Sequence, residues 1–172
     1  MKPHFFFVPF VVLLSQAVFA ATVGPVDVIS GGTVTIMGGP KGPLVEASIA
    51  TYALQGNTPQ EGDKAFLAKD CPWGKAPCSL VEDLALRVGK SQIYVPRSAF
   101  GGLANVRQAE LTTPSPGRFR LLLRGGDASE SYIAIIDFDK DRVMKRQISS
   151  ALSPRDVLEE TVYRLQKESF DR

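Results

Sequence analysis

The sequence predicts a mainly β protein: an antiparallel β-sandwich or small barrel with one short helical turn and a disulfide-stapled loop. Short runs of β-branched and aromatic residues alternate with glycine, proline and aspartate, which is typical of strands joined by turns. About 150 residues follow a removable leader, enough for one domain with its own core. Two cysteines, Cys71 and Cys78, stand close together in a polar segment.

Residues 1–20 have the order of a secretory signal peptide. Lys2 supplies a positive charge, residues 5–14 are apolar, and the segment ends on a small side chain at Ala20. The apolar run is too short to cross a bilayer as a helix, so no membrane span is expected in the mature protein. We expect cleavage after Ala20, a single β-rich domain over residues 21–172, and a location in the periplasm or outside the cell.

Loss of this leader also removes His4, the only histidine. Without histidine, Ser-His-Asp and Cys-His catalysis and histidine-ligated metal sites are excluded, so we expect no metal, no cofactor and no catalytic residue. Carboxylate chemistry of the glycosidase kind stays open. Removing Lys2 leaves 19 basic and 18 acidic residues, a net charge of +1 without a basic cluster, so nucleic acid is not an expected partner.

Six residues separate Cys71 from Cys78, too many for the Cys-x-x-Cys redox motif. In an oxidising compartment two cysteines this close are expected to pair. Closing so short a loop stabilises the fold by roughly 2–3 kcal/mol through the entropy of the unfolded chain. The predicted disulfide pins a long polar loop over residues 55–77.

In the first half, residues 33–37 and 44–54 are predicted strands between turns that contain glycine and proline. Residues 81–88 and 92–95 are predicted to pair as a compact hairpin. Residues 96–100 begin with a proline, which suits the start of one helical turn.

In the second half, strands are predicted at 106–112 and 119–124, and the two prolines within residues 113–117 are expected to end both. Residues 132–138 form the strongest predicted strand, which is apolar on both faces and therefore expected to be central and buried on both sides. A turn leads into a strand over 142–148. The basic side chains expected to form a solvated face there are Arg142, Lys145 and Arg146.

The pattern of the C-terminal segment, residues 156–167, fits two structures. Ser153 and Pro154 suit the cap and the first residue of a helix. A strand over residues 159–165 fits as well, so the residues alone leave both alternatives open.

Residues 125–132 are the best candidate binding site because they place polar and acidic groups directly before the strongest strand. A Gly-Gly pair lets the backbone approach a partner closely, and Asp and Ser side chains rigidify such a loop. The alternative is that these groups serve only the turn and that Tyr132 belongs to the core. Arg97 is added because its guanidinium can pair with a carboxylate of this protein or of a ligand. The predicted binding residues are Asp127, Ser129, Glu130, Ser131, Tyr132 and Arg97.

Two segments, Val95-Pro96-Arg97-Ser98-Ala99-Phe100 and Gly125-Gly126-Asp127-Ala128-Ser129-Glu130-Ser131-Tyr132, resemble a pattern shared by a group of small exported proteobacterial proteins. The resemblance covers roughly residues 84–165. It implies export and a β-rich fold, but no activity. Residues 159–163 resemble a closing strand in those proteins, which favours a strand over a helix at the C-terminus.

The chain is more loosely similar to periplasmic lysozyme inhibitors, small β proteins that insert a loop with serine and tyrosine into a glycosidase cleft. Here Ser129-Glu130-Ser131-Tyr132 departs from the Ser-Gly-x-x-Tyr pattern of one such family, and catalytic carboxylates would repel Glu130 unless it stayed at the rim. With the predicted export and the polar loop, the similarity implies an inhibitor or immunity-type protein. Its expected partner is a cell-wall-cleaving enzyme of the envelope, such as a lysozyme-like or amidase toxin.

Two other functions stay open. One is an envelope assembly or scaffold factor that binds through the exposed edge of the 81–95 hairpin. The other is a carboxylate-dependent hydrolase.

Overall fold

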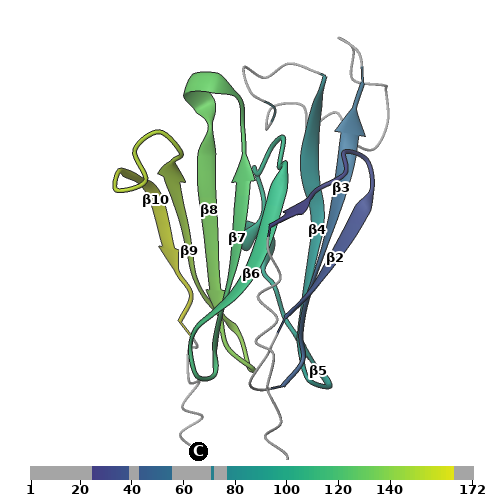
Figure 1. Ribbon diagram of the computed structural model, residues 1–172, viewed down its shortest axis with the longest axis vertical. Helices are drawn as coiled ribbons and strands as arrows, with labels where there is room; N and C mark the ends of the chain where they lie inside the picture. The colour runs from purple at the N-terminus through teal and green to yellow at the C-terminus, as the bar shows by residue number, and fades with distance from the viewer. Residues whose placement is uncertain (1–24, 39–42, 56–70, 72–76, 165–172) are drawn as a thin grey trace, which may run out of the picture.

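The structure is a computed structural model of the 172-residue chain, and it describes residues 25–38, 43–55, 71 and 77–164. The predicted signal peptide and most of the predicted 55–77 loop lie outside the described residues. The described chain forms two antiparallel sheets that face each other (Figure 1). The mainly β prediction is therefore confirmed, and of its two alternatives the structure is the sandwich.

The larger sheet has six strands, each antiparallel to its neighbours. From one edge to the other they are β1 (Val26–Asp27), β6 (Gln108–Ser115), β7 (Arg118–Gly125), β8 (Tyr132–Phe138), β9 (Val143–Ser150) and β10 (Val157–Val162). From β6 to β10 the strands follow one another in sequence, so hairpins build most of this sheet. Residues Val157–Val162 of the C-terminal segment are thus a strand, so the helical alternative is wrong there, and residues 165–167 lie outside the described residues.

The smaller sheet contains four strands, also antiparallel. In order across the sheet they are β2 (Thr33–Gly38), β3 (Val45–Leu54), β4 (Cys78–Val88) and β5 (Ser91–Ile93). The predicted 81–95 hairpin is confirmed as β4 and β5, and the predicted helical turn as the 3-10 turn η3 (Arg97–Ala99). The predicted disulfide joins Cys71 to Cys78 with their Cα atoms 5.8 Å apart.

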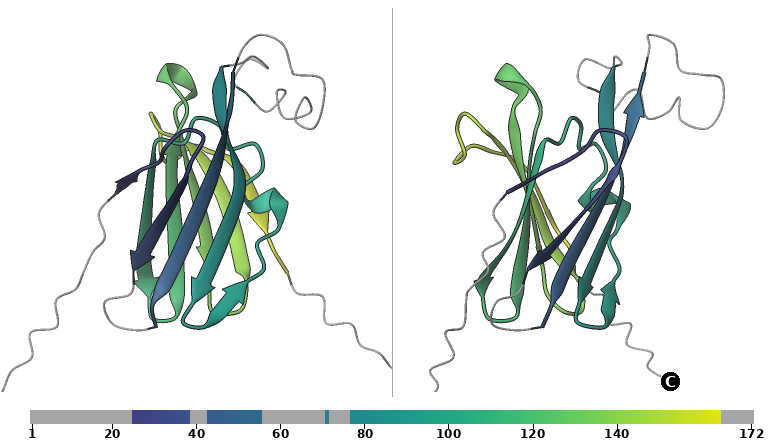
Figure 2. Two further views of the ribbon diagram at one scale, coloured as in Figure 1. Left: turned by 90° about the vertical axis from the view of Figure 1, so that its right-hand side faces the viewer. Right: turned by 45° about the vertical axis from the view of Figure 1, so that its right-hand side comes forward.

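The core lies between the two sheets, whose separation is clear in the right-hand view of Figure 2. Along each strand every second side chain points inward, so apolar residues at alternate positions meet their counterparts from the other sheet. Buried residues of the smaller sheet include Val45, Ala47, Ile49, Leu84, Leu86 and Val88. Those of the larger sheet include Leu121, Leu123, Ala134, Ile136 and Phe138.

The chain crosses from the smaller sheet to the larger one between η3 and β6, and this crossing covers part of the edge of β4. The Val81 N–H donates to the Leu103 carbonyl at 3.0 Å, and the Asn105 N–H donates to the Ser79 carbonyl at 2.6 Å. Because these β4 groups already have partners, the open edge of the 81–95 hairpin is centred on the short strand β5.

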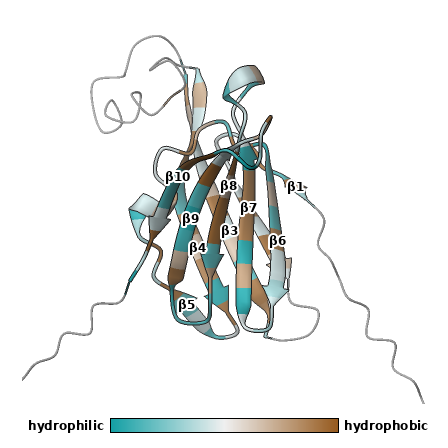
Figure 3. Ribbon diagram, turned by 90° about the vertical axis from the view of Figure 1, so that its left-hand side faces the viewer, coloured by the Kyte–Doolittle hydropathy of each residue, from teal (hydrophilic) through white to brown (hydrophobic). Residues whose placement is uncertain are grey.

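Strand β8 is central, but only one of its faces is buried. Ala134, Ile136 and Phe138 are fully buried in the core, whereas Ile133 and Ile135 are half-buried on the outer face. In the described chain no layer covers that face, and Figure 3 shows it turned toward the viewer. The expectation that both faces of the strand are buried is therefore wrong.

Strand β6 continues to Ser115, so the expectation that residues 113–117 end both strands is wrong for β6. The pairing of β6 with β7 shifts in register between Thr112 and Ser115, and Pro114 lies within this irregularity. A proline has no N–H to donate, and a local break in the ladder is where a strand tolerates one.

The expectation that Arg142, Lys145 and Arg146 form a solvated basic face is wrong for Arg146, which is buried. It is 4% exposed because it lies opposite Ile136, on the inner face of the sheet. Its guanidinium pairs with the Glu159 carboxylate of β10 and donates to the Gly101 carbonyl at 3.3 Å. A buried cation needs such partners, and strand β10 supplies the charged one.

Replacing Phe138 with alanine is expected to lower the free energy of unfolding by about 3–5 kcal/mol, because the change leaves a cavity between the sheets. The Phe138 ring also contacts Phe119, with the ring centroids 5.5 Å apart. Urea denaturation followed by circular dichroism measures the loss. Tyr94→Ala is the control: Tyr94 is 82% exposed, so a change within about 0.5 kcal/mol is expected. Equal losses in the two variants would contradict the described core.

Candidate functional site: the loop end of the sandwich

The predicted site projects from one end of the sandwich as the connection between β7 and β8, at the top of Figure 1. It contains a second 3-10 turn, η4 (Ala128–Glu130), which Asp127 caps: its Oδ1 accepts the Ala128 N–H at 3.0 Å. The Glu130 N–H donates to the Asp127 carbonyl at 2.8 Å, and the Ser131 hydroxyl donates to the Ala128 carbonyl. The expectation that Asp and Ser side chains rigidify this loop is confirmed.

The two glycines before the turn serve the loop's own packing. A Cβ atom on Gly125 would lie 2.5 Å from the Tyr132 hydroxyl oxygen, and one on Gly126 would overlap the Glu130 carbonyl. Gly126 also has a φ of +76°, which favours glycine. The close backbone approach that the Gly-Gly pair permits is therefore made within this protein.

Tyr132 attaches the loop to the body of the sandwich. Its hydroxyl donates to the Ala104 carbonyl at 2.8 Å, and its ring packs against the core. Burial raises the pKa of the phenol, so the hydroxyl stays a donor at any physiological pH. Of the two roles considered for Tyr132, a binding residue or a core residue, the structure shows the second, because the side chain lies at the edge of the core.

The other predicted residues divide into two places. Asp127, Ser129 and Glu130 are exposed on the loop, and Ser131 is half-buried beneath it. Arg97 is exposed on η3, which lies away from the loop in the left-hand view of Figure 2. The structure therefore brings the loop residues together and leaves Arg97 outside the site.

Arg107, which sequence reasoning missed, fixes the loop from the side. Its Nη2 lies 2.9 Å from Asp127 Oδ1, with 62% of the Arg107 side chain and 81% of the Asp127 side chain exposed. The hydrogen bond and charge of Arg107, with the Ala128 N–H, lower the pKa of Asp127. An ion pair this exposed is screened by salt, so it orients the loop without adding much stability. The pairing spans twenty positions and has no local signal.

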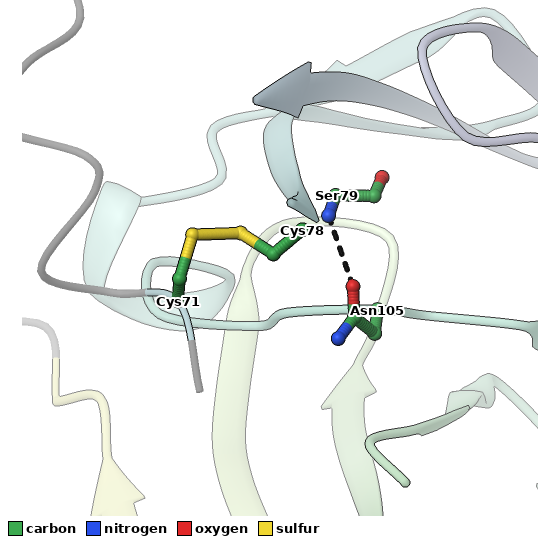
Figure 4. Close-up of a disulfide and its surroundings, with 4 residues drawn as sticks. All are labelled: Cys71, Cys78, Ser79 and Asn105. Atoms are coloured by element: carbon green, nitrogen blue, oxygen red, sulfur yellow. Dashed lines mark hydrogen bonds between the residues drawn. A yellow bond between two sulfur atoms is a disulfide. The ribbon is translucent and has the colours of Figure 1, made fainter. Parts of the chain in front are cut away.

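A cleft of about 480 Å³ lies beside the loop, where the two sheets separate. Its lining includes Asp127 and Arg107 as well as Ser79 and Asn105. The Ser79 N–H donates to Asn105 Oδ1 at 2.9 Å, directly after the disulfide at Cys78 (Figure 4). Asn105 has a φ of +50°, a conformation that asparagine adopts more readily than most residues. The hydrogen bond from Ser79 to Asn105 thus joins β4, next to the disulfide, to the crossing segment where both line the cleft.

The predicted hydrolase function has less structural support at this end than the binding function has. Hydrolysis needs two carboxylates about 5–10 Å apart in one cleft. Among the described residues, Asp127 is the only carboxylate that lines the cleft beside the loop, and Asp137 the only one in a second cleft of about 280 Å³. Each is held by an arginine, Arg107 and Arg120 respectively. The hydrolase stays a prediction without support from either cleft.

Within the described ranges, no three or more histidine, cysteine, aspartate or glutamate side chains gather as they would to hold a metal ion. None of the helical turns in the described chain is long and apolar enough to cross a membrane.

What the fold and site define is a disulfide-bonded antiparallel sandwich with a projecting, internally bonded loop beside an open cleft. Comparison of the chain with protein-family models, curated proteins and solved structures finds no match.

The Asp127 carboxyl is expected to titrate below pH 3.8, its ordinary value, because Arg107 stabilises the charged form. The contribution of this ion pair to the stability of the folded state is therefore present above pH 3.8. It is lost as the pH falls through the lower pKa that Asp127 has in the folded protein. Carbon-13 NMR of the Asp127 carboxyl measures the midpoint. Arg107→Gln should move the midpoint up toward 3.8, while Arg87→Gln, a change at an exposed arginine beside the β4–β5 turn, should not. A wild-type midpoint at or above 3.8 would show that the pair does not form in solution.

Proposed function

We propose that this protein is exported and binds a cell-wall-cleaving enzyme of the envelope through the 127–131 loop, as an inhibitor or an immunity protein. The observation that carries the proposal is the projecting turn η4, which offers Asp127, Ser129 and Glu130 to a partner. The disulfide supports the exported location, since such bonds persist in oxidising compartments.

The fixed shape of the loop favours a binding role. Asp127, Ser131 and the two glycines set its conformation through contacts within the protein, and Tyr132 ties it to the Ala104 carbonyl. A loop that is ordered before binding loses little conformational entropy on contact, so more of its contact energy appears as affinity. The cleft of about 480 Å³ beside it offers room for a side chain of the partner.

The charges of the loop restrict the partner's chemistry. The Asp127 carboxylate is already paired with Arg107, whereas Glu130 is exposed at the end of the turn. Catalytic carboxylates of a glycosidase would repel Glu130, so this side chain is expected at the rim of the enzyme cleft, beside a lysine or arginine. Ser129, as a neutral donor and acceptor, is the side chain suited to enter the cleft.

The test is inhibition of purified muramidases and amidases acting on suspended peptidoglycan, with the disulfide intact. Wild-type protein is expected to inhibit one of these enzyme classes. The double variant Ser129→Ala, Glu130→Ala should weaken inhibition at least about tenfold, the loss typical of residues central to a contact. Both side chains are exposed, and the residues that shape the loop are unchanged, so the thermal midpoint should stay constant.

The matched control is the double variant Lys140→Ala, Asp141→Ala, which removes two exposed side chains from the turn at the opposite end of β8. It should inhibit as the wild type does. Equal loss of inhibition in both variants would show that the loop is not the contact surface. Failure of the wild-type protein to bind or inhibit either enzyme class would overturn the proposed function.

A further inference from the structure

Strand β10 is the last strand of the six-stranded sheet, and among the described residues it pairs only with β9, so no described strand pairs with its other edge. The Tyr163 N–H, directly after the strand, donates to the Met144 carbonyl of β9 at 2.9 Å. Backbone groups of neighbouring residues point to opposite sides of a strand. The amides of Glu160 and Val162 therefore point away from β9, toward the open edge.

The side chains at this edge include exposed apolar residues. Leu158 is 67% exposed and Val162 is 55% exposed. Glu160 and Val162 lie opposite Gln147 and Lys145 of β9 and share the outer face, whereas Leu158 is the extra residue where the register shifts between Val157 and Glu159. Among the described edge strands, β1 has two residues and β5 has three. Strand β2 is longer, but its Gly38 lies against Leu111 of the other sheet. An open edge with exposed apolar side chains is a template for another strand.

Pairing with a second copy of this chain is disfavoured by Glu160. If two β10 strands pair antiparallel about Glu160, the two Glu160 carboxylates face each other. Like charges directly opposite destabilise such a pair. The acidic Glu160 and the apolar Val162 on one face instead complement a strand with a lysine or arginine and an apolar residue two positions away from it.

Glu160 can accept such a cation. Its side chain is 47% exposed, and its carboxylate's contact with Lys145 of β9 is long, 3.4 Å through Oε2. The neighbouring Glu159 is already used on the inner face, where it pairs with the buried Arg146. The two adjacent carboxylates thus have different roles. Glu159 pairs with a buried arginine, and Glu160 lies exposed on the outer face of the edge strand.

We propose that the β10 edge is a docking site for an extended segment of another protein, which adds antiparallel to β10 and places a basic side chain opposite Glu160 and an apolar one opposite Val162. Main-chain hydrogen bonds to the outward groups of Glu160 and Val162 hold the segment, and the side chains select it. This site is separate from the loop and does not depend on the proposed inhibition.

The probe is the synthetic peptide Thr-Ile-Thr-Lys-Thr-Val-Thr, titrated into nitrogen-15-labelled full-length protein lacking its leader. Amide signals of Glu160 and Val162 are expected to shift and to become protected from hydrogen exchange. A peptide with glutamate in place of lysine should bind about fivefold to tenfold more weakly, as cross-strand charge pairs allow. Glu160→Lys should reverse the preference between the two peptides.

Val162→Pro is the backbone variant, because it removes an outward amide without removing a bond to β9. It should abolish peptide binding and leave the thermal midpoint nearly unchanged, while the Ser129→Ala, Glu130→Ala protein should bind the peptide as the wild type does. Three results would overturn the proposal: no β10 shifts at millimolar peptide, equal binding of the lysine and glutamate peptides, or a wild-type dimer in sedimentation that Val162→Pro dissociates.

Discussion

Apolar side chains packed between the two sheets hold this molecule together, and the positions of its loop and of its open edge follow from that packing. Leu86 and Ile49 of the smaller sheet and Leu121 and Ile136 of the larger sheet are completely buried. Burying each such side chain stabilises the fold by about 1.5–3 kcal/mol. Because alternate positions along each strand are committed to this layer, the register of every strand is set, and with it the ends at which loops emerge.

The loop and the β10 edge depend on this framework in different ways. The loop is joined to it through Tyr132, whose ring packs at the edge of the core and whose hydroxyl reaches the crossing segment at Ala104. Strand β10 is joined through the Arg146–Glu159 pair, which links the buried face of β9 to the last strand. Polar contacts at the margin of the core thus position both surfaces, and the outermost side chains of each are exposed.

The parts of the fold that local pattern determines could be predicted from the sequence. The 81–95 hairpin, the strand at 132–138, the turn at 97–99 and the disulfide each depend on residues close together in the chain. Long-range placement could not be predicted. Arg146 lies in a segment with the pattern of an exposed basic strand, yet it is buried and paired with a carboxylate thirteen positions later. Arg107, which lies just before β6, pairs with Asp127 in the connection between β7 and β8. Position 125 requires glycine because a Cβ atom there would overlap the Tyr132 side chain, and the two residues come together only when β7 and β8 pair.

The central claim is that the loop end of the sandwich contacts a cell-wall-cleaving enzyme. The most direct measurement replaces Ser129 with a photoreactive amino acid, cross-links the disulfide-bonded protein in periplasmic and secreted extracts, and identifies the product by mass spectrometry. The same replacement at Lys140, at the opposite end of the sandwich, is the reference. We predict a cross-linked muramidase or amidase from position 129 and none from position 140. Cross-links to such an enzyme from position 140 alone, or from neither position, would contradict this account.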